Sequence, residues 1–333
     1  MINRTRYFVI ASLVVLSVGV GTGLVAFFVG FPAGAFQRRG GPQELQYIPR
    51  DSALIAYANV HEIMTSELRQ KLRRVIPLHE NGQREFQDRT GINVETDIDR
   101  VVACVRPDAT NSDLPGSGMV LARGRFDEVK IESLMREHGG HVEDYHGKRI
   151  VVGGGGRHAG NFGIAFVEPG LVAVGTLPIV RTAIDLHQGG DNPQTGVASA
   201  TGNEELMNLV RSLETGNAWA VGRFDVLTAR AKLPEAVAER LPPITWFSAS
   251  SHINGGLSGV VRAEARDEEA ANNLRDVVRG FLALARLQAG SRPDVQAMIQ
   301  SLELQGTGST VALSFTVPAE IFDAIAALAP PRP

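Results

Sequence analysis

The sequence has very little sulfur chemistry available to it. Cys104 is the only cysteine among 333 residues, so an internal disulfide and a thiolate metal cluster are both excluded. It lies in the apolar run RVVACVRP, a pattern that favours a buried, unreactive thiol over a nucleophile. No cysteine follows the N-terminal apolar run, which excludes a lipoprotein anchor.

The chain also lacks a concentration of positive charge. Four of its 33 basic residues precede residue 40, which leaves 29 basic against 36 acidic residues in the remainder. Binding to nucleic acid requires a clustered basic footprint. The mixed, mildly acidic body therefore argues against a nucleic-acid partner.

Charge is missing altogether from Tyr7 to Phe36. A helix of about 20 apolar residues spans the hydrocarbon core of a bilayer, so residues 1–36 are predicted to form an N-terminal transmembrane signal anchor. Ala33-Gly34-Ala35 would also fit the cleavage site of a secretory signal, but the apolar stretch of such signals is only about 7 to 15 residues long. Basic residues flank both ends of the run, so the positive-inside rule does not decide its orientation. The short segment of six residues before the run, and the large body after it, favour one orientation in the cytoplasmic (inner) membrane. The N-terminus is then on the cytoplasmic side, and the body is in the periplasm or extracytoplasmic space.

Two glycines in this run, Gly19 and Gly23, have the G-x-x-x-G spacing that lets membrane helices approach closely. Glycine is also common in membrane helices in general. The pair is therefore a candidate contact for a homodimer through the transmembrane helix, and not a signature of one.

The body is predicted to be α+β, with two related halves. Residues 37–50 form a polar linker, and residues 51–190 follow the order β-α-β-β-α-β with an extra hairpin and helix appended. Residues 191–215 form a second linker with a short helix, and residues 216–333 repeat the order. The predicted fold is a transmembrane helix followed by two ferredoxin-like repeats.

Side chains suited to capping mark the expected starts of four helices. Asn59, Asp127, Asp225 and Asp267 each stand where a predicted strand gives way to helical periodicity. Their side-chain oxygens can accept from the unpaired amide groups of a first helical turn. We interpret the recurring tetrapeptide Gly-Arg-Phe-Asp as an end-of-strand and cap signal.

The segment EHGGHVEDYHGKR, residues 137–149, suggests a metal site, with His138, His141 and Glu143 as candidate ligands. His138 is expected in a last helical turn, His141 at the start of a strand and His146 at its turn. Five residues of strand separate the last two histidines by about 16 Å, too far for one ion with ligand bonds of about 2 Å. No metal and no cofactor is therefore predicted.

The glycine-rich segment VVGGGGRHAGNFG, residues 151–163, lacks the lysine and the spacing of a phosphate-binding loop. A flexible connection between hairpins is favoured, with Arg157 and His158 as candidates for a ligand loop. Ser251 and His252 are adjacent in a predicted strand, where neighbouring side chains point to opposite faces. They do not make a nucleophile with its base.

Residues 268–289 form a long predicted helix, with Leu274, Val277, Phe281 and Leu284 on one side. Such a stripe is typical of a helix that packs on a sheet or lies on a membrane surface. Charges of both signs on the other side, and strands before and after the helix, favour packing on a sheet.

Three segments resemble those of a family of uncharacterised bacterial single-pass membrane proteins with a large extracytoplasmic α+β domain. They are YIPRDSALIAYANVHEIMTSELRQKL, GINVETDIDRVVACV and LARGRFDEVKIESLMREHGGHVEDYHGKRI. The resemblance covers most of the chain, but its motifs are fold-forming and not catalytic. It implies a location and an architecture, and it assigns no activity and no functional residue.

The chain has no nucleophile, metal or cofactor signature, so we expect it to be non-enzymatic. The predicted function is a membrane-anchored extracytoplasmic binding or scaffolding protein, a non-catalytic subunit or accessory factor of an envelope complex. Its expected partners are the cytoplasmic membrane and a protein of the envelope. Two alternatives stay open, a metal-dependent or hydrolytic envelope enzyme and a carrier of a lipid or small apolar ligand.

Overall fold

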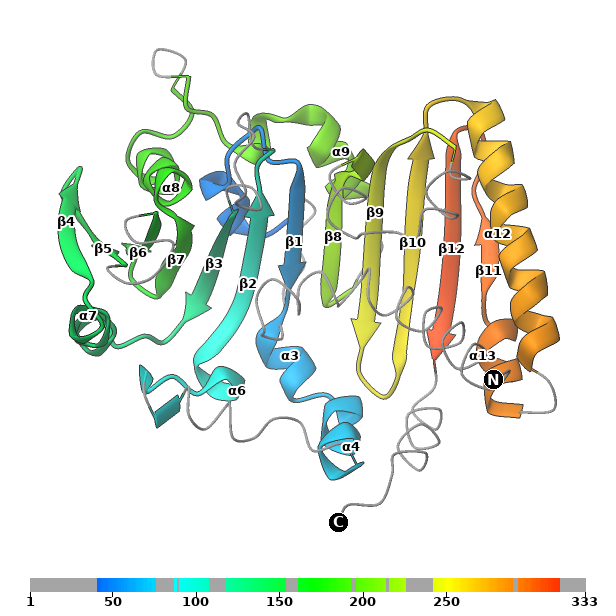
Figure 1. Cartoon of the computed structure of the whole chain (residues 1–333), viewed down its shortest axis with the longest axis horizontal. Helices are drawn as coiled ribbons and strands as arrows, with labels where there is room; N and C mark the ends of the chain where they lie inside the picture. The colour runs from blue at the N-terminus through cyan, green and yellow to red at the C-terminus, as the bar shows by residue number, and fades with distance from the viewer. Residues whose placement is uncertain are drawn as a thin grey trace. The chain divides into compact units, whose positions relative to one another are not determined.

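The computed structural model describes nine stretches of the chain (Figure 1). They are residues 41–75, 87–88, 90–107, 118–153, 161–192, 196–213, 216–225, 242–289 and 293–317. The predicted anchor over residues 1–36 lies outside them. Within the described stretches, no helix is long and apolar enough to cross a bilayer.

The chain divides into two compact units. The first unit holds the described residues of Val29–Met64 and His79–Ser212, and the second holds those of Thr65–Leu78 and Leu213–Pro333. The first predicted linker, residues 37–50, contains regular structure in its described part. Gln43–Tyr47, in the first predicted linker, is a short 3-10 helix, η2, with Leu45 fully buried.

The first unit contains seven strands within its described residues. Its strands are β1 (Leu54–Ala58), β2 (Ile98–Val105), β3 (Gly118–Gly124), β4 (His141–Tyr145), β5 (Lys148–Val152), β6 (Phe162–Glu168) and β7 (Leu171–Thr176). Its α-helices include α3 (Val60–Met64), α6 (Val94–Asp97), α7 (Glu128–Glu137), α8 (Leu177–Gly189) and α9 (Glu204–Ser212), with the 3-10 helix η3 (Ala200–Gly202) before the last.

The second unit contains five strands within its described residues. They are β8 (Ala218–Arg223), β9 (Ile244–Ile253), β10 (Leu257–Ala265), β11 (Glu303–Gln305) and β12 (Thr310–Val317). Its helices include α4 (Glu67–Val75), α12 (Glu268–Ala289) and α13 (Pro293–Gln300).

The prediction that the body consists of two ferredoxin-like repeats is wrong. Within each unit the described strands pair in an antiparallel arrangement. In the first unit the strand order is β1-β2-β3-β7-β6-β5-β4, and in the second it is β8-β9-β10-β12-β11.

The difference lies in how strands pair, not in which segments are strands. In a split β-α-β unit the two strands joined by the helix run parallel with another strand between them. Here β1 and β2 are direct antiparallel neighbours, with Ile55 opposite Cys104. The hairpin β6–β7, predicted as an appendage, is inserted into the sheet, because β7 pairs with β3 and β6 pairs with β5.

The predicted helix caps are confirmed at three of the four positions. Asn59 accepts from the amide of Glu62 at 3.0 Å, Asp127 from that of Lys130 at 3.0 Å, and Asp267 from that of Ala270 at 2.8 Å. The residues expected to form the helix after Asp225 lie outside the described residues. These caps form where they were expected because a cap depends only on residues within one turn of chain.

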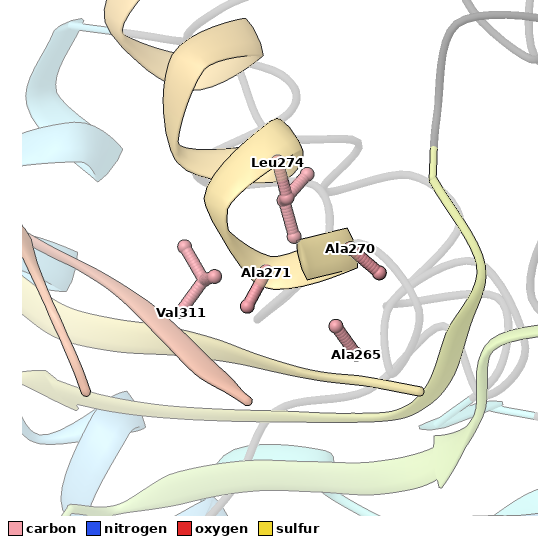
Figure 2. Packing of buried hydrophobic residues seen from close by; sticks show 5 residues of the cluster. All are labelled: Ala265, Ala270, Ala271, Leu274 and Val311. Atoms are coloured by element: carbon pink, nitrogen blue, oxygen red, sulfur yellow. The ribbon is translucent and has the colours of Figure 1, made fainter. Parts of the chain in front are cut away.

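Helices cover the sheet of each unit. In the first unit, α8 and η2 contact each other, and α8 packs against β3, β6 and β7. In the second unit, α12 packs against β10, β11 and β12. Figure 2 shows the core of that contact, where Ala271 and Leu274 of α12 lie near Val311 of β12 and Ala265 of β10.

Candidate functional site

A buried carboxylate, Glu44 on η2, is the centre of a charged network in the first unit. Its side chain is only 1% exposed. Arg100 of β2 and Arg123 of β3 stand directly opposite each other on neighbouring strands. Both arginines donate from Nε to Glu44 Oε1, Arg100 at 3.0 Å. Like charges in opposite positions on a sheet repel, so one carboxylate oxygen holds the two guanidinium groups together.

The network continues from Arg123 to Glu168 at the end of β6. Arg123 donates from Nη2 to Glu168 Oε1, and the Tyr47 hydroxyl donates to Glu168 Oε2 at 3.0 Å. The ring of Tyr47 also packs edge to face against the ring of His187, and the two ring centroids are 5.6 Å apart. The network thus links η2, β2, β3, β6 and α8.

Burial alone would raise the pKa of the Glu168 carboxyl. Hydrogen bonds from Arg123 and Tyr47, together with the charges of Arg123 and His187, outweigh burial and lower this pKa below its ordinary value of 4.5. Burial and the hydrogen bond to Glu168 raise the pKa of the Tyr47 hydroxyl. Glu168 is therefore ionised and Tyr47 is neutral over the whole physiological range.

We interpret this network as a clamp that fastens η2 to the sheet. Its two carboxylates and two guanidinium groups balance in charge, and no nucleophile takes part in it. Glu44 Oε2 is buried and has no hydrogen-bond partner. Sequence patterns gave no sign of this site, because Glu44 was assigned to a linker and its partners stand 56 and 79 residues away.

The clamp predicts how stability responds to acid. A carboxyl whose pKa is lower in the folded state stabilises fully above its unfolded pKa, and this contribution is lost as pH falls through the folded value. We therefore expect the free energy of unfolding to drop below about pH 4.5, and to drop less steeply in Glu168→Gln. Urea titrations at a series of pH values measure this slope. Glu137→Gln is the control, since Glu137 is exposed and has no ion pair within the described residues; an equal change in slope there would contradict the assignment to Glu168.

The histidine-rich hairpin carries a second group of polar side chains. His138 is the C-cap of α7, as its expected place in the last turn implies, and its Nδ1 lies 2.8 Å from the carbonyl of Leu134. His141 Nε2 lies 3.2 Å from Glu143 Oε1, and Arg181 of α8 donates to Glu143 Oε2 at 2.6 Å. These hydrogen bonds from His141 and Arg181 lower the pKa of the Glu143 carboxyl.

The metal candidates His138, His141 and Glu143 do not form one ligand set here. Across the described part of the chain, no three His, Cys, Asp or Glu side chains lie close enough together to hold an ion. The other sequence candidates, Arg157 and His158, lie outside the described residues, as do Gly19 and Gly23 of the membrane segment.

His146 occupies the turn of this hairpin in an unusual backbone conformation. Its φ is 50° and that of Gly147 is 72°, so the two-residue turn is of the type in which both central residues have positive φ. The ring stacks on Tyr145 at 4.4 Å, and Nδ1 lies 3.0 Å from Asp185 Oδ1. Asp185 also accepts from the Tyr145 hydroxyl at 3.1 Å. The turn is thereby fastened to α8.

We expect His146→Val to destabilise the protein by about 1 to 2 kcal/mol, because a β-branched residue is strained at positive φ. His146→Asn should cost much less, since asparagine tolerates this conformation and precedes glycine in favoured hairpin turns. Both variants lose the imidazole, so chemical denaturation of the pair isolates the backbone effect. Equal losses in the two variants would instead assign the effect to the contact with Asp185.

Cys104 is buried at 2% exposure, as its apolar surroundings predict. Burial raises the pKa of its thiol to about 12. A thiol in this state is neither a nucleophile nor a metal ligand at neutral pH. Ser251 is also buried, at 3% exposure, while His252 beside it is exposed, which agrees with neighbouring side chains on opposite faces of a strand.

An apolar stripe on α12 is the remaining candidate surface. Phe281 is 47% exposed, Leu284 is 54% exposed and Leu287 is 78% exposed. Residues three apart lie near one another on a helix surface, so the three side chains form a short stripe. In contrast, Leu274 is only 6% exposed and Leu282 only 7%. The prediction that α12 packs on a sheet is thus confirmed for its buried face, and the stripe is a second apolar face that was not expected.

No model of a known protein family matches this chain, and no curated protein matches it. One solved structure, titled "Structure of crystal form I of TP0453", has a TM-score of 0.48 and 10% sequence identity, with 87% of this chain and 99% of that chain covered. A similarity at this level transfers neither a fold nor a function.

Proposed function

We propose that this protein is a non-catalytic binding subunit tethered to the outer face of the cytoplasmic membrane. Three features support the proposal. The first is the uncharged run from Tyr7 to Phe36, long enough to span a bilayer. The second is the short distance along the chain from that run to the packed body. The third is that the buried carboxylate of the first unit, Glu44, is paired with Arg100 and Arg123.

The short tether is the observation that carries the proposal. Gly41 is only the fifth residue after Phe36, and Leu45 is already fully buried. Five extended residues reach at most about 17 Å, less than the diameter of a small domain, about 30 Å. The body is therefore held against the membrane, and the clamp around Glu44 fixes the point where the tether joins the sheet.

The proposal is tested with the full-length protein in its native membrane. We expect mass spectrometry to find residues 1–36 intact, and external protease to reach the body in cells without an outer barrier. Crosslinking should then capture one envelope protein reproducibly. A mature chain that begins near Phe36, or a body protected from external protease, would overturn the tethered arrangement.

A released form of the same body is the matched control for the partner. In it, residues 1–36 are replaced by a cleavable secretory signal, so that the body reaches the same compartment without its anchor. A partner that binds at the membrane surface should be lost or strongly reduced. Equal capture by the released body would show that the anchor plays no part in binding.

A further inference from the structure

We propose that the stripe of Phe281, Leu284 and Leu287 on α12 binds the surface of the lipid bilayer. The inference rests on the proposed function, because the tether is what brings a membrane within reach. It adds a second point of membrane contact, on α12.

Helix α12 has two apolar faces, and the stripe is on the face that does not pack on the sheet. One face packs on the sheet through Ala270, Ala271 and Leu274, near Ala265 and Val311 (Figure 2). Phe281, Leu284 and Leu287 project elsewhere and are about half exposed or more. Apolar side chains of this size are expensive to leave in water, and a contiguous group of them marks a contact surface.

The charges around the stripe suit the interface between lipid and water. The run from Gly280 to Ala285 is uncharged, and Arg279 and Arg286 stand at its two ends. Both arginine side chains are exposed, and Arg279 also donates to Asp276 Oδ1 at 2.8 Å. Amphipathic helices that lie on membranes place phenylalanine and leucine in the acyl boundary, while basic side chains reach the phosphate groups.

The size of the stripe favours lipid over a protein partner. Three half-exposed side chains offer apolar area on the order of 300 Å², whereas a stable protein interface buries about 800 Å² on each partner. A small apolar contact is sufficient for a body that is already tethered, since the tether makes the second contact intramolecular. A bilayer is such a surface, and the tether holds it within about 17 Å of Gly41.

Fluorescence quenching in reconstituted vesicles tests this inference. The full-length protein is placed in vesicles of phosphatidylethanolamine and phosphatidylglycerol, and an environment-sensitive fluorophore is attached at Leu284→Cys or at Leu287→Cys. Labelling is specific because Cys104 is buried and burial raises the pKa of its thiol to about 12. Asn272→Cys, exposed in the N-terminal part of the same helix, is the control.

Lipids with a quencher on the acyl chain should reduce the signal at 284 and 287 at least about twofold, and leave the signal at 272 nearly unchanged. Adding Leu284→Glu to the protein labelled at 287 should relieve the quenching. Absence of quenching at 284 and 287 would overturn the inference. So would efficient disulfide crosslinking of Leu287→Cys between two copies without quenching, because the stripe would then bind a second copy.

Whether the N-terminal anchor is intact in the same samples distinguishes a failure of this inference from a failure of the proposed function. An intact anchor without quenching leaves the tether in place and rejects the lipid contact. If the anchor is removed during export, the tethered arrangement fails, and the labelled mature protein is added to the same vesicles instead. Quenching there would support lipid binding by α12 alone, and its absence would reject the lipid contact as well.

Discussion

Replacing Glu44 by alanine is expected to destabilise the protein by about 2 to 3 kcal/mol, because the change leaves two opposed guanidinium groups without their shared carboxylate. Arg100 and Arg123 keep 22% and 21% of their side chains in contact with solvent. This access lets water screen part of their repulsion, which places the cost below that of a fully buried pair. Equilibrium unfolding in urea measures the loss.

Two further variants separate charge from shape. Glu44→Gln keeps the size of the side chain and an oxygen acceptor, so a loss similar to that of Glu44→Ala would identify the negative charge as the stabilising feature. Asp51→Asn removes a carboxylate from Arg106 in the same unit, but Asp51 is 55% exposed. An exposed pair contributes at most about 1 kcal/mol. If Asp51→Asn cost as much as Glu44→Ala, burial would not explain the strength of the clamp.

Short-range features of this fold could be predicted from the sequence. Asn59, Asp127 and Asp267 cap their helices because each cap is decided within three residues. The end of α7 was predicted for the same reason, since Gly139 adopts a φ of 85° and Gly140 donates to the carbonyl of Met135 at 2.9 Å. Such positions depend on local backbone geometry that few residue types satisfy.

Strand pairing could not be predicted in the same way. Alternation of side chains identifies β6 and β7 as a hairpin, but it does not say which neighbour the hairpin joins. The pairing of Met119 with Gly175 inserts the hairpin beside β3, and it joins residues 56 positions apart. The ferredoxin-like order failed at this step, because partner choice depends on contacts distant in sequence.

Sequence analysis missed the clamp around Glu44, and on α12 it favoured sheet packing over a membrane-surface helix. Glu44 lies in a polar, glycine-containing stretch that reads as a linker, and only the folded sheet brings Arg100 and Arg123 to it. On α12, periodicity identified an apolar helix correctly, but the apolar positions of this helix cover more than the face that packs on the sheet. Leu274 and Leu284 therefore belong to the same pattern while one is buried and the other exposed.

The two faces of α12 predict the second large effect, a difference in stability between two leucine-to-alanine variants. Leu274→Ala should cost about 3 kcal/mol, because it leaves a cavity where the side chain packs with Ala271 and Val311. Leu287→Ala should cost less than about 0.5 kcal/mol, since that side chain is 78% exposed. The two changes are chemically identical and lie in one helix, so helix propensity cancels in their comparison.

The comparison is made by urea unfolding in detergent, at two protein concentrations. A large loss for Leu287→Ala that grows with protein concentration would show that the stripe is buried between copies in solution. A small loss at both concentrations, next to a large one for Leu274→Ala, would show that the stripe contributes nothing to the stability of the isolated chain. An apolar surface that does not stabilise the fold is then free to contact the bilayer, and the quenching experiment on the same helix decides whether it does.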